Sequence, residues 1–474
     1  MRPLEILLPI VSAFTLLWPL AQFGRREILG LLPTFALLIV ITHARVEGMR
    51  WQMYPLYAIT GILFLMSLPT YLRAAKPGET TLAVNRPSVG ITIASLGLLA
   101  VATALPILLP VPSLPTPGGP YAIGTRAYEL IDTSREEIYA SIPGQPRRIM
   151  VQVWYPAVPP PLNSAPAPWL PEAAANAPLL SGFFNLPNFF FSHVALAKTH
   201  SYNDLPVLSG GRYPVLVFSH GWDGFRQQST YQMEELASRG YIVLAPDYAY
   251  GALVTRYPNG DVAYNNPAAL PKDVPPDQYE IAARKLVAQW SDDIGYTLDY
   301  FAAQNADANS PFYQALNLEK VGAFGHSTGG GATIQFCATD PHCKAGFTED
   351  AFVRPLAIAT LENGTTQPFF YLFSEAWPFA RNIELFDQYY SHVPLENHVA
   401  VLMGTAHYDF SDLPAFSPLA AAMGLKGPLN GARVQKIINT YLVAFFDQTL
   451  KGSASPLLTG PSPDYPELQW RAPK

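Results

Sequence analysis

The chain has 474 residues, of which 49% are apolar and 14% charged, and its formal net charge is −6 at pH 7. This length exceeds that of a typical single domain, so we expect two regions. The mild charge has no run of like sign, which argues against a nucleic-acid-binding surface. The two cysteines, Cys337 and Cys343, are too few for a disulfide scaffold or a zinc site, but they can form one local disulfide or remain free thiols.

The first 110 residues contain four apolar stretches without a charged residue: 6–24, 28–42, 52–72 and 87–110. A membrane-spanning helix needs about 20 such residues, so these stretches predict a transmembrane bundle of about four spans, of which the second is the shortest. A cleaved signal peptide is the alternative for the first stretch. It is disfavoured because the apolar run is long and because Arg25, Arg26 and a second apolar run follow at once.

The basic residues between these stretches predict an orientation. More of them lie in the first and third loops (Arg25, Arg26, Arg73, Lys76 and Arg86) than on the opposite side (Arg2, Arg45 and Arg50). This bias places the two loops in the cytoplasm, and both termini and the long C-terminal region outside it. No acidic residue or histidine lies within the four stretches, and His43 stands at an edge. The bundle is therefore predicted to be an anchor rather than an ion path.

Residues 111–120 are rich in proline and glycine and are expected to form a linker. Residues 121–474 then alternate between apolar runs typical of buried parallel strands and amphipathic helical segments. The expected strands are 149–155, 214–218, 241–245, 321–324, 345–348, 368–373 and 398–403, and the expected helices include 233–238, 276–304 and 432–450. Such alternation predicts a doubly wound α/β sheet that binds ligands at the carboxyl ends of its strands.

Residues 156–210 interrupt this alternation and are expected to form an insertion resembling a cap. They are rich in proline and alanine and contain a group of phenylalanines between residues 183 and 191. Three roles are open for this aromatic group: it lines an acyl pocket, it dips into a lipid interface, or it packs as the core of the insertion.

The segment from Gly325 to Gly329 fits the pattern G-x-S-x-G, with Ser327 at its centre. An apolar run precedes it and a helical pattern follows it, which is the strand–turn–helix context that a nucleophile elbow requires. The glycines are needed because larger side chains collide in so tight a bend. The alternative is a glycine-rich turn with a buried serine.

A serine hydroxyl needs a general base, and the base needs a third group to hold it. In a fold of this kind the chain order is serine, acid, histidine. His407 is the candidate base, because it follows the strand 398–403, whereas His398 begins that strand and His392 precedes it. Asp350 and Glu375 both follow expected strands, and the residues alone leave the choice of acid between them open.

An oxyanion hole needs two backbone donors. One is expected to be the amide of Thr328, directly after the nucleophile. The other is expected to be the amide of Trp222, because Ser219-His220-Gly221 lets the backbone turn close to the site after an early strand.

These residues resemble the platelet-activating factor acetylhydrolase family of α/β-hydrolases, a fold of the dienelactone-hydrolase type. The matching segments are 217–222 (VFSHGW), 236–241 (LASRGY), 325–330 (GHSTGG), 345–350 (AGFTED) and 404–412 (GTAHYDFSD). The resemblance covers roughly residues 120–450 and leaves the membrane region unexplained. It implies that Asp350 is the acid rather than Glu375. The chain departs from the family at Thr328, where an aromatic residue is usual, and at Ala351, where glycine is common.

The resemblance implies a serine esterase that needs no metal or cofactor and acts on a carboxylic ester. A phospholipid with a short or oxidised acyl chain is the expected substrate, and the lipid bilayer is the expected partner. A polyester, a lipoprotein or a small soluble ester is the alternative substrate. A binding module that keeps the fold without catalysis is the alternative function.

Overall fold

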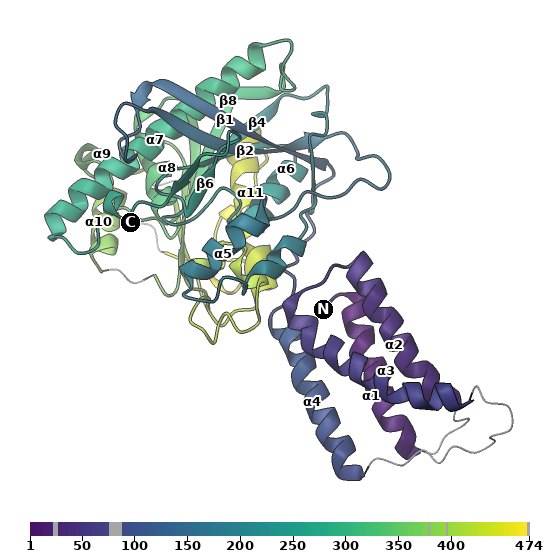
Figure 1. Ribbon diagram of the computed structural model, residues 1–474. Helices are drawn as coiled ribbons and strands as arrows, with labels where there is room; N and C mark the ends of the chain where they lie inside the picture. The colour runs from purple at the N-terminus through teal and green to yellow at the C-terminus, as the bar shows by residue number, and fades with distance from the viewer. Residues whose placement is uncertain (22–26, 75–87, 378–379, 395–396, 472–474) are drawn as a thin grey trace.

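The structure is a computed structural model that describes residues 1–21, 27–74, 88–377, 380–394 and 397–471. Figure 1 shows a bundle of helices projecting from one end of an α/β part, with the N-terminus at the end of the bundle nearest to it. The segments 22–26 and 75–87, which hold four of the eight basic residues behind the predicted orientation, lie outside the described residues.

The bundle contains the helices α1 (Pro3–Ala21), α2 (Glu27–Val46), α3 (Tyr54–Ala74) and α4 (Val89–Leu108), with a short 3-10 helix, η1 (Trp51–Met53), before α3. Two segments of the described residues, Trp51–Pro69 and Val89–Leu108, are long and apolar enough to cross a membrane by length and composition. The apolar parts of α1 and α2 are shorter, Pro3–Pro19 and Leu31–Val46.

The bundle has a narrow core and an apolar outer surface. Its buried interior consists of Leu8, Val11, Ala36, Ile39, Met53, Leu56, Leu99 and Ala102. Large apolar side chains on the outer surface stay exposed, among them Phe14, Leu65, Met66 and Val101. A soluble protein rarely leaves so much contiguous apolar surface open to water.

The α/β part is built on a ten-stranded sheet in the order β12-β11-β10-β9-β8-β4-β5-β2-β1-β3. Its strands are β1 (Ala122–Glu136), β2 (Pro146–Ala157), β3 (Ser201–Asn203), β4 (Tyr213–Ser219), β5 (Ile242–Asp247), β8 (Leu316–His326), β9 (Cys343–Glu349), β10 (Phe369–Ser374), β11 (His398–Leu402) and β12 (Leu468–Trp470). The pairs from β5 through β11 are parallel. Strand β2 pairs antiparallel with β1 and β5, and β12 pairs antiparallel with β11. This confirms the predicted, mostly parallel α/β sheet.

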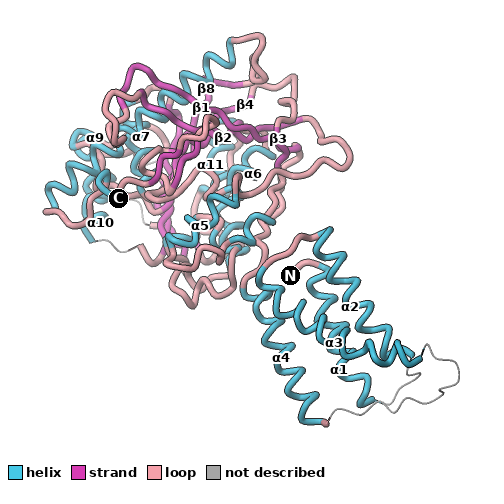
Figure 2. The backbone as a smooth tube through the Cα atoms, in the orientation of Figure 1, coloured by secondary structure: helices cyan, strands magenta, loops and turns pink. Residues whose placement is uncertain are grey.

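Helices cover both faces of this sheet (Figure 2). The α-helices of the α/β part and its insertion are α5 (Ala173–Phe183), α6 (Thr230–Ser238), α7 (Pro276–Ala306), α8 (Thr328–Thr339), α9 (Ile358–Asn363), α10 (Ala380–Tyr390) and α11 (Gly431–Lys451). Strand β4 shows why its sequence is continuously apolar. Val215 and Val217 point into the core beneath α7 and α8, whereas Leu216 and Phe218 point into the core beneath α6 and α11.

The insertion packs between the sheet and the bundle. Helix α5 and the short helix η2 (Ser192–Leu196) share a third apolar core with Leu114, Trp169 and Phe416. Phe191 is buried in this core, while Phe189 remains 56% exposed. The aromatic group of the insertion is thus divided between a packed interior and an open surface.

The two cysteines are joined in the structure. Cys337 lies near the end of α8 and Cys343 begins β9, and their sulfur atoms are 1.97 Å apart. Closing so short a loop contributes roughly 2 kcal/mol of stability on the chain-entropy model. The bridge lies at the amino end of β9, opposite to the end where the candidate catalytic residues gather.

Candidate active site

Ser327 occupies the sharp turn between β8 and α8, with a φ of 57° and a ψ of −122°. A non-glycine residue at positive φ is strained, and such strain is concentrated at functional sites. The turn is too tight for a side chain at Gly329, where a Cβ would collide with the carbonyl oxygens of Ser219 and His220. The glycine of the motif is therefore required by the close approach of β4, as the pattern predicted.

Asp350 and His407 come together at the carboxyl ends of β9 and β11. The Nδ1 atom of His407 lies 3.0 Å from Oδ2 of Asp350. Asp350 also accepts hydrogen bonds from the backbone N–H and the hydroxyl of Ser374, each 2.7 Å long. Glu375 makes a different contact, because its carboxylate accepts the N–H of Gly404 at 2.7 Å. The hydrogen bond that orients the imidazole therefore goes to Asp350, and Glu375 supports the turn before His407.

Burial governs the charge states of this pair. Burial raises the pKa of Asp350 to about 7, although its hydrogen bonds from Ser374 act in the opposite direction. Burial lowers the pKa of His407 to about 3, so the imidazole is neutral at pH 7. A neutral imidazole whose Nδ1–H is held by a carboxylate leaves Nε2 free to accept a proton. The ring is also held by stacking on Trp377, with centroids 4.1 Å apart.

Ser327 and His407 line the same cavity, which has a volume of about 110 Å³. Among the described residues no hydrogen bond joins the Ser327 hydroxyl to His407; such bonds are often long in ligand-free enzymes and shorten when substrate binds. The remaining wall is mostly apolar and includes Trp169, Leu180, Phe183, Phe184, Trp222, Phe225, Leu253, Leu413 and Phe416. A small apolar cavity beside a serine suits the acyl part of an ester.

The two backbone amides predicted for an oxyanion hole lie at and next to this cavity: Trp222 lines it, and Thr328 directly follows Ser327, which lines it. Thr328 is the first residue of α8, and Trp222 lies in the turn after β4. Within the described part of the chain, neither amide donates a hydrogen bond to another backbone or side-chain group. Gly221 permits the approach of this turn, since a Cβ there would lie 3.2 Å from Cβ of Ser327. Both amides are thus available to a ligand, and the helix N-terminus adds a partial positive charge.

Sequence reasoning missed His326, which holds the backbone of the candidate base. Its Nε2 atom lies 2.9 Å from the carbonyl oxygen of His407, and its Nδ1 atom lies 3.3 Å from Nε2 of Gln228. Burial, followed by the neighbouring His407, lowers its pKa to about 3, so this ring is also neutral at pH 7. In the sequence, the only signal for His326 was its place at the variable position directly before the serine of the G-x-S-x-G pattern.

Asp412 was also missed as a structural part of the site. Its carboxylate accepts hydrogen bonds from the indole N–H of Trp169 at 2.7 Å and from the backbone N–H groups of Thr230 and Tyr231 at 2.9 and 3.2 Å. It therefore caps helix α6 and ties the loop that carries His407 to the wall of the cavity.

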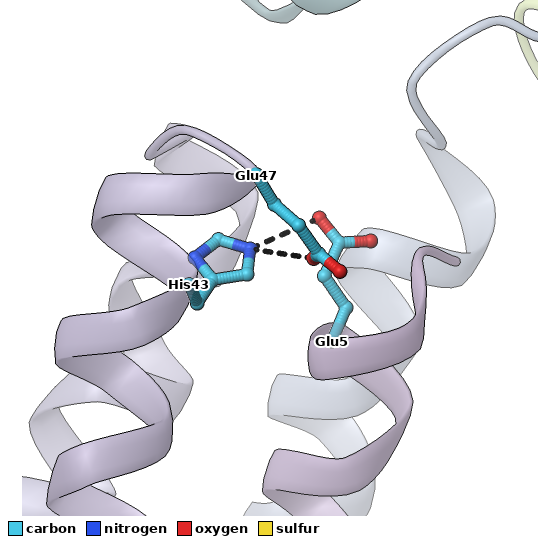
Figure 3. Close-up of side chains that lie close together, drawn as sticks. All are labelled: Glu5, His43 and Glu47. Carbon is cyan, nitrogen blue, oxygen red and sulfur yellow. Dashed lines mark ion pairs between the residues drawn. The ribbon is translucent and has the colours of Figure 1, made fainter. Parts of the chain in front are cut away.

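A group in the bundle resembles a metal site by its donor atoms alone. Glu5, His43 and Glu47 bring their ligand atoms within 4.8 Å of one another, as Figure 3 shows. However, both Arg2 and Arg50 make ion pairs with Glu5. Two guanidinium groups balance the two carboxylates, so the group is explained as an ion-pair network without a cation.

The same group lies at the edges of two apolar stretches of the sequence. The first stretch begins at residue 6 and the second ends at residue 42, so Glu5 and His43 stand just outside them. Helix α1 instead begins at Pro3 and α2 continues to Val46, so both residues are helical and fully buried. Mutual pairing allows these polar groups to be enclosed at the end of the bundle.

The comparisons with known proteins agree with this geometry. Residues 111–267 and 304–454, which make up more than half of the chain, match the family model described as platelet-activating factor acetylhydrolase, isoform II. The chain belongs to this family. A platelet-activating factor acetylhydrolase of Canis lupus familiaris is 26% identical over 56% of this chain and 62% of that protein. The chain therefore spans less than two thirds of that relative.

Two further proteins cover more of the chain. A probable 1-alkyl-2-acetylglycerophosphocholine esterase of Arthroderma benhamiae is 25% identical over 80% of this chain and 98% of that protein. The solved structure of a ferulic acid esterase from Streptomyces cinnamoneus covers 76% of this chain and 100% of its own, with a TM-score of 0.63 and 22% identity, and shows the likeness of the fold. Family membership and the two relatives named above support a carboxylic ester hydrolase.

Proposed function

We propose that the protein is a serine esterase anchored in a membrane, with Ser327 as nucleophile, His407 as general base and Asp350 as the acid that orients it. The observation that carries the proposal is that the strained elbow serine and the imidazole paired with Asp350 line one cavity. The amides of Trp222 and Thr328, which donate to no other group among the described residues, support it.

The proposed reaction has two halves. The hydroxyl of Ser327 attacks the ester carbonyl while Nε2 of His407 takes its proton, and the two amides stabilise the tetrahedral oxyanion. His407 then gives the proton to the leaving alcohol, which leaves an acyl-enzyme on Ser327. Water, deprotonated by Nε2 of His407, then attacks the acyl carbon. The bond from that carbon to Ser327 breaks, His407 returns the proton to the Ser327 hydroxyl, and the carboxylic acid leaves. Asp350 stabilises the imidazolium that forms in each half.

The proposed substrate is an amphiphilic ester with a short or oxidised acyl group, such as a phospholipid of that kind. The size of the cavity, about 110 Å³, supports a short acyl group. The names of the relatives, which refer to acetyl esters of alkyl glycerophosphocholine, support a lipid substrate.

The four helices of the bundle are proposed to cross the membrane, with the α/β part outside the cytoplasm. Their exposed apolar side chains support contact with lipid. The disulfide between Cys337 and Cys343 supports an oxidising compartment, because structural disulfides are rare in the cytosol.

The proposal is tested with p-nitrophenyl esters of increasing acyl length and with a phospholipid that carries an acetyl group. The native protein is expected to hydrolyse the short-chain substrates. Ser327→Ala is expected to lower kcat by a factor on the order of 10⁴ to 10⁶. Activity that survives this substitution would exclude the proposed nucleophile, and the absence of hydrolysis by the native protein would favour a binding module.

A further inference from the structure

The end of the bundle nearest the α/β part is rigidly built. Arg50 is 3% exposed, and its guanidinium donates to both carboxylate oxygens of Glu5, at 2.7 and 2.8 Å. The same guanidinium also donates to the carbonyl oxygens of Pro106 and Leu109 at the end of α4. The residue directly before Trp51 is thus tied to both α1 and α4.

Trp51 lies against the insertion from this rigid end. Its indole N–H donates to the carbonyl oxygen of Phe190 at 3.1 Å. Its ring makes an edge contact with Phe189, at 5.3 Å between centroids, and a tilted contact with Phe190, at 5.9 Å. The turn before it also packs on the insertion, since Gly48 has a φ of +81° and a Cβ there would lie 2.7 Å from Leu196.

From Trp51 a continuous series of aromatic contacts reaches the wall of the cavity. Phe190 contacts Phe191, with centroids 5.1 Å apart, and Phe191 contacts Phe184 and Phe416, with centroids 5.7 and 6.0 Å apart. Phe184 and Phe416 both line the cavity that holds Ser327. Aromatic rings are stiff and pack in preferred geometries, so displacement at one end of such a series moves the other.

A second contact links the bundle to the same wall. The hydroxyl of Ser417, the residue next to Phe416, donates to the carbonyl oxygen of Leu108 at 2.6 Å. Two separate points of the bundle, Trp51 and Leu108, are therefore linked to the apolar wall, and both links reach the segment that carries Phe416.

From these contacts we propose that Trp51 is a positioning residue for the acyl-binding wall, so that the membrane bundle sets the acyl-chain preference of the active site. This inference rests on the proposed esterase function and adds a role for the bundle beyond anchoring. Acetyl esters, which scarcely reach the wall, are hydrolysed independently of Trp51. Longer acyl groups, which contact Phe184 and Phe416, depend on it.

The test compares full-length native protein with Trp51→Ala in the same detergent, using p-nitrophenyl acetate and p-nitrophenyl hexanoate. An aromatic contact of this kind changes an equilibrium by a factor of roughly 2 to 12. The variant is expected to lose about that factor in kcat/KM for the hexanoate, mainly through KM, and to keep its rate on the acetate. Trp51→Phe, which retains the ring, is expected to lose less.

Met66→Ala is the matched control, because Met66 lies on the same bundle, is 72% exposed and has no part in these contacts. It is expected to leave both rates unchanged. If Trp51→Ala lowers both rates in proportion, or neither, the inference is wrong.

Backbone hydrogen exchange over residues 183–191 separates this inference from the proposed function, since it needs no catalysis. Exchange in this segment is expected to rise in Trp51→Ala and to stay at the native level in Met66→Ala. If the native protein hydrolyses neither ester, the esterase proposal fails, whatever the exchange shows. If it hydrolyses both but exchange in the segment is unchanged by Trp51→Ala, the inference alone fails.

Discussion

At the scale of single residues, the site depends on which carboxylate holds the imidazole. Asp350 directly follows β9 and Glu375 directly follows the neighbouring strand β10, yet their carboxylates have different partners. Asp350 is fully buried against His407 and Ser374, whereas Glu375 accepts only the N–H of Gly404 among the described residues. Substitution of each in turn therefore gives distinct results.

Asp350→Asn is expected to reduce kcat by roughly 10³- to 10⁴-fold, because an amide cannot stabilise the imidazolium and favours the wrong tautomer of His407. Glu375→Gln keeps an oxygen that can accept the Gly404 N–H, so its effect should stay within about tenfold, the cost of weakening one hydrogen bond. Steady-state rates on p-nitrophenyl acetate measure both. Equal losses in the two variants would contradict the assignment of Asp350.

The pH dependence follows from the same pair. Burial raises the pKa of Asp350 to about 7, and the ionised form is the one that stabilises the imidazolium. The value of kcat/KM for an uncharged ester is therefore expected to rise with pH through about 7 and to fall as Asp350 becomes protonated below it. Because the two groups are coupled, the midpoint belongs to the pair. A rate that does not change between mildly acidic and mildly basic pH would contradict this account.

The sequence predicted much of the site at this scale because its residues follow rules of chain order. The elbow pattern predicted Ser327 as the nucleophile, and its position after a strand predicted His407 as the base. The rules could not separate Asp350 from Glu375, because only the contact of Nδ1 does so. His326 and Asp412 were missed because they act on a backbone carbonyl and on a helix end that lie far away in the sequence.

At the scale of elements, the elbow between β8 and α8 depends on close packing against β4. Gly329→Ala would place a Cβ against the carbonyl oxygens of Ser219 and His220. Because backbone atoms cannot move aside as a flexible side chain can, this change is expected to lower the free energy of unfolding by about 3 kcal/mol or more. Chemical denaturation of the detergent-solubilised protein measures the effect.

Gly182→Ala is the control for this prediction. Gly182 lies in helix α5, and a Cβ there meets nothing within 4 Å. Alanine at that position should retain stability or raise it by about 0.5 to 1 kcal/mol, because glycine is a poor helix former. A Gly329→Ala variant as stable as Gly182→Ala would show that the turn is looser than the structure indicates.

The strands that the sequence predicted most clearly are those buried on both faces. Strands β4, β5, β8 and β10 read as continuous apolar runs because each face meets a core. Strand β1 was missed because its sequence does not follow its burial: apolar Ile131 is exposed, whereas polar Thr125 and Asp132 are buried. It pairs as an antiparallel hairpin with β2. Helices α1 and α2 include the polar residues Glu5 and His43, which the apolar stretches leave out, because ion pairs allow these residues to be buried.

At the scale of the whole molecule, the four crossings that we propose put both ends of the bundle on the same side of the membrane as the α/β part. Figure 1 shows the N-terminus and the end of α4 close to that part. A reporter that is active only in the cytoplasm, fused after residue 474, is expected to stay inactive, and one inserted between residues 75 and 87 is expected to be active. The reverse pattern would overturn the proposed orientation, and equal activity at both positions would overturn an even number of crossings.

The proposed esterase function requires an activated hydroxyl at Ser327, and a fluorophosphonate probe tests for it most directly. Such a probe reacts with a serine only when a base and an oxyanion hole surround it. Mass spectrometry of the labelled, natively folded protein is expected to find the adduct on Ser327, and to find it lost in His407→Ala. An unlabelled Ser327 in folded protein, or labelling that persists without His407, would contradict the account.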